Sequence, residues 1–291
     1  MIRFQKLLCI SMILTIALSS IPVSAFTLTE PSPMPTPNVK EGFLVMDTDR
    51  DAPLPERYRD LPSLNISGSA QFEPSQIENL KNHIHVIDTY IVDLRQESHG
   101  FLNDDAVSFY STERLLNNGF DSEETLISEN EKFGAMKPGD VENIFNKRGA
   151  FREEIKVEKS QVELALAKSA DLNYVLFATR DGHIPTPSMV DSFVTFVVKT
   201  PPTTHLHFHC DHGEGRTTMF MAMFQMMKES NLKSLNEILD EQLDAGGIIL
   251  TDDTTRANFL QDFYDYTKEN ASTNFKTTFS VWSQKYSKSN F

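Results

Sequence analysis

The chain has 291 residues, of which 40% are hydrophobic and 23% charged, a composition typical of a soluble globular protein whose core needs no disulfide staples. Its formal net charge of −14 argues against non-specific binding of nucleic acid, because an acidic chain repels a polyanion. The same charge repels anionic ligands, so any phosphate site has to supply its own local positive field.

The N-terminus has the three parts of a secretory signal peptide. Arg3 and Lys6 form a basic region, residues 7–18 are apolar but short for a membrane span, and small residues end at Ala25. We therefore expect residues 1–25 to be removed, which predicts a secreted or periplasmic protein without a stable membrane anchor. A retained anchor is the alternative, but no longer apolar stretch follows it.

Only one cysteine remains after that cleavage. Cys9 lies in the signal peptide, so Cys210 is left alone and no intramolecular disulfide can form. Loss of the two basic residues of the signal peptide also takes the net charge from −14 to −16. Residues 26–40 are rich in proline and predict an extended linker, and residues 41–291 are expected to fold as one domain.

Buried strands and helices alternate along the rest of the chain. We expect strands at 90–95, 174–178 and 204–210, a helix starting at Pro74, and helices at 160–170, 187–198, 217–228 and 234–245. Capping boxes at Ser160/Glu163 and Ser234/Glu237 open two of these helices. Residues 117–158 are charged, weakly periodic and left unassigned. The alternation predicts an α/β fold with a mainly parallel sheet, helices on both faces, and sites beyond the carboxyl ends of the strands.

The segment HCDHGEGRT, residues 209–217, places five residues between Cys210 and Arg216 at a strand-to-helix junction. This spacing lets one tight loop wrap a phosphate with its backbone amides and the helix N-terminus. The Arg216 fork matches two phosphoryl oxygens, and Gly213 and Gly215 are expected to supply the backbone angles of the loop. The loop residues predicted to bind substrate are Asp211, His212, Gly213, Glu214, Gly215 and Thr217.

These surroundings favour the thiolate of Cys210, the form that attacks phosphorus. The Thr217 hydroxyl can donate a hydrogen bond to the sulfur and later stabilise the departing thiolate. The alternative is a buried cysteine that merely precedes a helix. The order of strand, Cys-x5-Arg, two glycines, threonine and helix argues against that alternative.

A leaving alcohol needs a proton, so a general acid must lie across the pocket. Asp181 opens the loop DGHIP that follows the second buried strand, and His183 is its rival. An ordinary turn aspartate before Gly182 is an equally good explanation from spacing alone. Arg180 and His183 are added to the residues predicted to contact substrate.

At this point the chain resembles a known family. HCDHGEGRT is similar to the signature of protein-tyrosine-phosphatase-like enzymes, and Asp181-x-x-x-Pro185 resembles their acid loop. Four further segments resemble the bacterial cysteine phytases, which are myo-inositol phosphate phosphatases of this kind: ISGSA at 66–70, IVDLRQESHG at 91–100, HLHFHC at 205–210 and SVW at 280–282. The resemblance runs from about residue 43 to residue 282.

The resemblance implies a phosphatase core with a small partial β-barrel, built from about 41–62 and 117–158. It also implies a phosphocysteine at Cys210, acid then base action by Asp181, phosphate capture by Arg216, and no metal or other cofactor. By analogy, four residues support or line the pocket; a structural salt-bridge network beneath the loop is an equal alternative for them. They are Asp93, Arg95, Glu97 and His99.

Several positions depart from the family pattern. Ile184 and Gly182 replace a usual tryptophan and histidine of the acid loop, Leu44 replaces a basic residue, and residues 248–256 are short and acidic rather than lysine-rich. Acidic residues also stand within the Cys loop. These departures predict weaker preference for the most phosphorylated inositols, without affecting phosphatase chemistry.

The leading hypothesis is therefore an exported phosphatase of inositol polyphosphates such as phytate. A phosphatase of phosphotyrosine or phosphoinositide lipids is the nearest rival, although the loop lacks the lysines that lipid phosphatases favour. A phosphate-binding module without catalysis is the non-enzyme alternative, and the intact Cys210, Arg216 and Asp181 argue against it. Arsenate reductases generally need further cysteines, which the mature chain lacks.

Overall fold

A computed structural model describes residues 34–38, 42–48, 52–111 and 115–289, with side chains to residue 284. Residues 35–291 form one compact unit, and residues 34–38 have no regular secondary structure. The predicted signal peptide and most of the predicted linker lie outside the described residues. None of the helices in the described part combines the length and apolar character that crossing a membrane requires.

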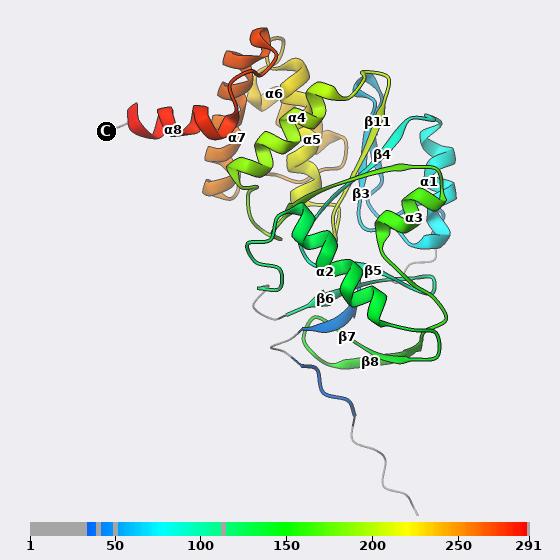
Figure 1. The fold of residues 1–291 in the computed structure, drawn as a ribbon. Coiled ribbons are helices and arrows are strands. Elements are labelled where there is room, and N and C mark those ends of the chain that lie inside the picture. The colour runs from blue at the N-terminus through cyan, green and yellow to red at the C-terminus, as the bar shows by residue number, and fades with distance from the viewer. Residues whose placement is uncertain (1–33, 39–41, 49–51, 112–114, 290–291) are drawn as a thin grey trace, which may run out of the picture. The chain divides into compact units, whose positions relative to one another are not determined.

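A five-stranded sheet forms the centre of the fold (Figure 1). In spatial order its strands are β10 (Asn173–Thr179), β4 (Thr89–Arg95), β11 (His205–His209), β3 (Ile66–Ser69) and β2 (Arg59–Leu61). The first four are parallel to their neighbours, and β2 is antiparallel to β3. The prediction of a mainly parallel sheet is confirmed. The carboxyl ends of β4, β10 and β11 meet at one edge, where the Cys loop begins.

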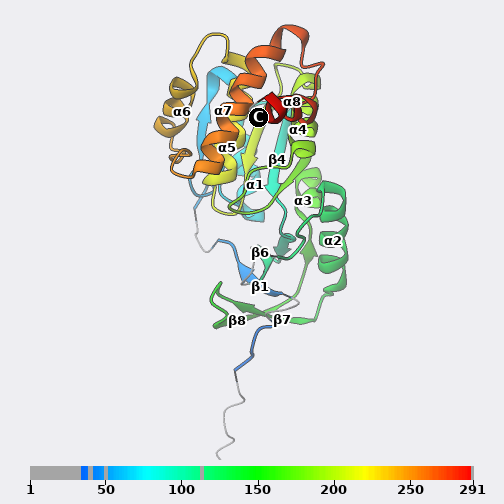
Figure 2. The same cartoon turned by 90° about the vertical axis from the view of Figure 1, so that its left-hand side faces the viewer.

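Helices cover both faces of this sheet (Figures 1 and 2). On one face lie α1 (Ile77–Ile84) and α3 (Glu163–Ser169), and on the other α4 (Pro187–Lys199), α5 (Gly215–Glu229), α6 (Leu235–Asp244), α7 (Thr254–Asn270) and α8 (Phe279–Ser289). Side chains alternate between two cores because successive strand residues point to opposite faces. Val92 packs with α4 and α5, whereas Ile91 packs with α1 and α3. Helix α5 is buried from Arg216 to Met227, as its apolar sequence predicts.

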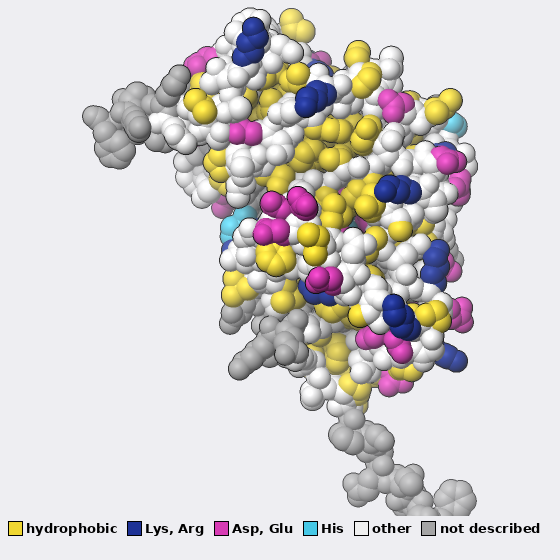
Figure 3. Space-filling view, in the orientation of Figure 1, with side chains coloured by type: hydrophobic (Ala, Val, Ile, Leu, Met, Phe, Trp, Pro, Cys, Tyr) yellow, Lys and Arg dark blue, Asp and Glu magenta, His cyan; other side chains and the backbone are white. Residues whose placement is uncertain are grey.

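A second sheet of six strands lies at the end of the central sheet that carries the Cys loop (Figure 2). In spatial order its strands are β8 (Phe151–Lys156), β7 (Val141–Phe145), β1 (Phe43–Met46), β6 (Asp105–Tyr110), β5 (His99–Leu102) and β9 (Ser160–Gln161). Helix α2 (Ser122–Ala135) packs beside it, and Figure 3 shows acidic side chains over the start of that helix. The described residues also contain three single-turn helices: η1 (Pro62–Leu64), η2 (Pro74–Gln76) and η3 (Ala271–Thr273).

The segments expected to build the small β subdomain, 41–62 and 117–158, agree only in part with the second sheet, to which they contribute β1, β7 and β8. Residues 59–61 pair with β3 in the central sheet, and residues 122–135 form α2. Strands β5 and β6, at 99–110, were not expected and sit in the middle of the second sheet. Closure of that sheet into a partial barrel stays a prediction.

The expected capping box at Ser160 and Glu163 is wrong. Ser160 belongs to β9, and α3 begins at Glu163 after Val162, which provides no side-chain cap. Glu163 is fully buried and pairs with His209 instead, because a buried ion pair takes precedence over a local cap. The second box is confirmed, since Ser234 caps α6 and exchanges hydrogen bonds with Glu237.

Candidate active site

The Cys loop joins the end of β11 to the start of α5, as the sequence predicts. Cys210 is 3% exposed, and the Thr217 hydroxyl donates a hydrogen bond to its sulfur over 3.1 Å. The loop thus ends on the N-terminus of a 15-residue helix, whose free amides and dipole favour negative charge. The sulfur therefore sits beside a hydroxyl donor and a positive helix end, both of which stabilise a thiolate.

The two glycines of the loop have different roles. Gly213 has φ of +70°, and a Cβ there would lie 2.4 Å from the backbone nitrogen of Ala70. Only glycine fits this position, because both the conformation and the space exclude a side chain. Gly215 is not in the left-handed region, and the nearest atom to a Cβ there is Nη2 of Arg256, at 4.0 Å. The expectation that Gly215 supplies a special backbone angle is wrong; it is simply the first residue of α5.

Arg216 is held beneath the loop by Glu97. Its Nη1 and Nη2 donate to the two Glu97 carboxylate oxygens over 2.8 and 2.9 Å, and Nη1 also donates to the carbonyl of Thr179. The buried Nε of Arg216 has no hydrogen-bond partner among the described residues. Although burial alone would raise the pKa of Glu97, Arg216 and Arg95 lower it to about 2, so the pair stays ionised.

Arg95 extends this network into the core. Its Nε donates to Glu97 over 2.9 Å, and its Nη1 contacts Asp47 at 2.9 Å and Gln71 at 2.8 Å. Burial disfavours the charged guanidinium, but Asp47 and Glu97 outweigh burial and raise the pKa of Arg95 well above its ordinary value. Arg95 is therefore a permanently charged support on which Glu97 is fixed.

Asp93 and His99 lie deeper, the first on β4 of the central sheet and the second at the start of β5 in the second sheet. Asp93 accepts a hydrogen bond from the Tyr174 hydroxyl over 2.6 Å and lies 3.2 Å from Nε2 of His99. His99 also pairs with Glu129 at 3.0 Å. Burial opposes protonation of His99, but Asp93 and Glu129 raise its pKa well above the ordinary value. Of the four residues with alternative roles, Arg95 and Glu97 line the pocket as well as support it, whereas Asp93 and His99 are purely internal.

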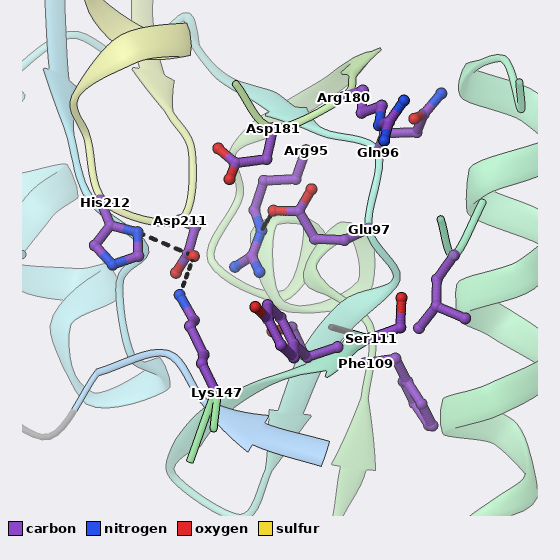
Figure 4. A pocket seen from close by; sticks show the side chains of 13 residues that line it. Arg95, Gln96, Glu97, Phe109, Ser111, Lys147, Arg180, Asp181, Asp211 and His212 are labelled. Atoms are coloured by element: carbon purple, nitrogen blue, oxygen red, sulfur yellow. Dashed lines mark hydrogen bonds and ion pairs between the residues drawn. The ribbon is translucent and has the colours of Figure 1, made fainter. Parts of the chain in front are cut away.

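The loop after β10 brings Asp181 to the pocket. Oδ1 of Asp181 lies 3.4 Å from Nη2 of Arg216, and both Asp181 and Arg180 line the pocket above the Cys loop (Figure 4). His183 is exposed, lies outside the pocket lining, and bonds through Nδ1 to the Asp181 carbonyl at 3.0 Å. The geometry therefore favours Asp181 over His183 as the acid.

The opposite wall of the pocket comes from the second sheet. It consists of the end of β6 and the turn between β7 and β8, and it contributes Ser108, Phe109, Tyr110, Ser111 and Lys147. Nζ of Lys147 reaches Oδ2 of Asp211 at 2.6 Å, and Figure 4 shows this lysine approaching the loop from the second sheet. The β6 residues were missed from the sequence, because they carry no motif and reach the site only through strand pairing. Gln96 lies inside the segment IVDLRQESHG but was not singled out there.

The remaining loop side chains point in different directions. Asp211 contacts His212 Nδ1 at 3.0 Å, and both line the pocket. Burial alone would raise the pKa of Asp211, but His212, Arg95 and Lys147 outweigh burial and lower the pKa below its ordinary value, so Asp211 stays ionised. Glu214 instead pairs with Arg57 at 2.9 Å and lies outside the pocket lining, which argues against its predicted contact with substrate.

Buried acids and histidines gather into two groups beneath the site. Among the described residues, two groups could hold an ion by geometry, and they share Asp93: one with Glu163 and His209, the other with His99 and Glu129. In both groups the same atoms already pair with one another, at 2.7 Å between His209 and Glu163. These residues therefore act as internal ion pairs, away from the pocket.

The chain is similar to known phosphatases in both sequence and structure. The family model of PTP-like phytases, described by the words inositol hexakisphosphate, matches residues 92–228. A PTP-like phytase from Bdellovibrio bacteriovorus is 30% identical, with a TM-score of 0.70, over 88% of this chain and 97% of that one. A PTP-like myo-inositol phosphatase from Mitsuokella multacida, solved with myo-inositol-(1,3,4,5)-tetrakisphosphate, is 28% identical with a TM-score of 0.76, over 86% of this chain.

A more distant relative is the effector protein hopD2 of Pseudomonas syringae pv. tomato, 25% identical over 62% of this chain. This chain covers 43% of that protein and 50% of the Mitsuokella protein, so it spans about half the length of these relatives. The Bdellovibrio protein, in contrast, is covered almost completely. The Cys loop, the acid loop and the near-complete match to the Bdellovibrio structure together show that the chain belongs to the family of PTP-like phytases.

Proposed function

We propose that this protein is a cysteine-dependent phosphatase that hydrolyses myo-inositol polyphosphates, phytate among them, through a phosphocysteine intermediate. The observation that carries the proposal is the grouping of Cys210, Arg216 and Asp181: the Cys loop that holds the first two contributes Asp211 and His212 to the pocket lining, and Asp181 lines the same pocket. The thiol accepts a hydrogen bond from Thr217, the guanidinium has a spare buried Nε–H, and the carboxylate lies 3.4 Å from that guanidinium.

In the first step the Cys210 thiolate attacks phosphorus and the bond from phosphorus to the inositol oxygen breaks. Arg216 and the loop amides bind the phosphoryl oxygens, whose charge they stabilise more strongly in a water-poor site. Asp181 gives its proton to the leaving oxygen, so the product departs as an alcohol. In the second step water attacks the phosphocysteine, Asp181 takes a proton from it, and the thiolate leaves with the help of Thr217.

The wall opposite the Cys loop supports a substrate that carries more than one phosphate. Lys147 lines the pocket from the second sheet and Arg180 from the acid loop, where further phosphates of an inositol would lie. The Mitsuokella relative was solved with an inositol tetrakisphosphate, which supports the same substrate class. The negative charges of Asp181 and Asp211, which line the same pocket, nevertheless offset the positive charges of Lys147 and Arg180. We therefore expect phytate hydrolysis with modest preference for six phosphates over fewer.

Phosphate release from a panel of substrates tests the proposal. The panel contains inositols with three to six phosphates, phosphotyrosine peptides and phosphoinositide vesicles, with Cys210→Ser as the control. Release from the inositol phosphates, absent in the control, is the expected result. No release from any inositol phosphate, with rapid release from phosphopeptides, would reassign the enzyme to protein substrates.

We also propose that the protein is exported and carries no stable membrane anchor once its signal peptide has been removed. The support is the sequence of residues 1–25. N-terminal sequencing of the native protein tests this. A mature N-terminus at Phe26 is expected, and an intact Met1 on the native protein would contradict it.

A further inference from the structure

A line of side chains, all buried except the partly exposed Glu97, connects the two ends of the Cys loop through the core. Starting from Arg216, it passes to Glu97 and then to Arg95, through the contacts of 2.8–2.9 Å given above. Nη1 of Arg95 then donates to Oε1 of Gln71 at 2.8 Å. This line of contacts thus leads from the pocket into the core below the loop.

The second half of the line returns to the residue before the cysteine. Nε2 of Gln71 donates to Oε2 of Glu163 at 2.8 Å, and Oε1 of Glu163 lies 2.7 Å from Nε2 of His209. His209 directly precedes Cys210. Together with the loop itself, these contacts close a ring that runs from the cysteine to the arginine and back.

Gln71 has the chemistry that this position requires. Its amide oxygen faces a cation, Arg95, and its amide nitrogen faces an anion, Glu163; only a side chain with one acceptor and one donor satisfies both neighbours. It is 2% exposed, so an unmatched partner here could not turn to water. Its backbone N–H also donates to the carbonyl of Asp211 in the loop, at 3.1 Å.

Glu163, the first residue of α3, completes the ring. It is fully buried, and although burial raises the pKa of its carboxyl group, His209 and His99 lower it below the ordinary value. It is therefore a charged residue that fixes the imidazole next to the nucleophile. Neither Gln71 nor Glu163 lines the pocket, so both act through other residues.

We propose that Gln71 and Glu163 are positioning residues, which set the placement of Cys210 relative to Arg216 by closing this ring. The proposal rests on the proposed phosphatase function and adds two residues that contact neither substrate nor reacting atoms. Its physical basis is that a buried line of paired polar groups restricts the side chains that it joins, and that nucleophile and phosphate clamp must be held to within about 0.5 Å.

An exchange of the two side chains tests the ring. Gln71→Glu alone puts a carboxylate against Glu163, and should lower kcat on an aryl phosphate by about 10²-fold, the loss that a 1 Å displacement of catalytic groups causes. Glu163→Gln alone should lower kcat less, because the new amide can rotate to keep one contact. In the double variant every contact of the ring can form again, with the negative charge moved by one position. The double variant should therefore regain at least about tenfold in kcat over Gln71→Glu.

The matched control is Gln225→Glu, on α5 and remote from the pocket. Gln225 is 1% exposed and donates to Glu229 over 2.8 Å, so its substitution creates the same like-charge contact in another part of the core. We expect it to lower the melting temperature and leave kcat unchanged. Each variant is measured for kcat, KM, melting temperature and affinity for inorganic phosphate by calorimetry.

Three results would overturn the inference. The first is an unchanged kcat in Gln71→Glu, and the second is a Gln71→Glu variant whose melting temperature falls while its kcat and phosphate affinity stay at the wild-type values. The third is a double variant whose kcat is no higher than that of Gln71→Glu. If Gln71→Glu does not fold, the double variant must recover both folding and kcat, and its failure to do so counts against the ring. Inactivity of the wild type on every phosphoester would instead refute the proposed function. In that case, phosphate affinity in the same variants still tests the ring.

Discussion

The floor and the far wall of the pocket are built in opposite ways. The floor consists of the Cys loop and the ion pairs beneath it, and the side chains of Arg216 and Arg95 there are 2% and 0% exposed. The far wall and the acid loop are open, since the side chains of Lys147 and Asp181 are 36% and 44% exposed. Charges interact strongly in the buried floor and are screened at the open wall. We infer that the floor determines the chemistry and the wall determines which substrate is preferred.

The floor should show the largest effect, through the nucleophile itself. Cys210→Ser should abolish turnover of every substrate, because a hydroxyl in place of the thiol is not ionised near neutral pH. Phosphate should still bind, since the loop amides and Arg216 remain. Activity assays and calorimetry with inorganic phosphate check the two halves of this prediction, and substantial residual turnover would contradict it.

Asp181→Asn tests the acid loop, which stands between floor and wall. It should lower kcat by about 10²–10⁴ for inositol phosphates, the usual contribution of general acid catalysis. An aryl phosphate with an activated leaving group needs little protonation, so its loss should be smaller. The same leaving-group dependence in His183→Ala, and none in Asp181→Asn, would transfer the role to His183.

Glu97→Gln tests the ion pair that holds Arg216. The folded-state pKa of Glu97, about 2, lies below its ordinary value of 4.5, so the ionised carboxylate stabilises the fold above pH 4.5. That contribution is lost as the pH falls from 4.5 through about 2. At pH 7 the variant should be less stable by about 3 kcal/mol, as for a broken buried pair, and the gap to wild type should close in acid. Melting temperatures of both proteins across this range check it, and a gap independent of pH would contradict it.

Lys147→Met should have the smallest effect, confined to the wall. It should raise KM for inositol hexakisphosphate several-fold and leave kinetics on an aryl monophosphate unchanged. Added salt should weaken wild-type binding in the same selective way, because exposed charges are screened over roughly 8 Å at 0.15 M. An equal loss on both substrates would show that Lys147 supports the floor through Asp211 rather than contacting substrate.

The two regions also differ in how far the sequence predicts them. The Cys loop is encoded locally, within nine residues, so its position between β11 and α5 and the contact of Thr217 with the sulfur could be predicted. Asp181 was predicted only as one of two candidates, because the choice between it and His183 depends on which side chain faces the pocket. The part of the wall that comes from β6 could not be predicted, since Ser108 and Ser111 reach the pocket only through pairing of distant strands.

Local signals also failed where burial decides the outcome. Ser160 and Glu163 have the spacing of a capping box, yet Glu163 turns inward to His209. Gly213 and Gly215 look equivalent in the sequence, yet only Gly213 lies against the backbone of Ser69 and Ala70. In both cases the deciding partner is at least 46 positions away in the chain, beyond the reach of any local pattern.

The most direct test of this account is to trap the covalent intermediate. Wild type and Cys210→Ser are mixed with phosphate-labelled inositol hexakisphosphate, quenched in acid within milliseconds, and digested for mass spectrometry. We predict a burst of labelled protein in the wild type, with the phosphate on the peptide that contains Cys210, and none in the variant. Label on another residue, or steady hydrolysis without any labelled protein, would contradict a phosphocysteine mechanism.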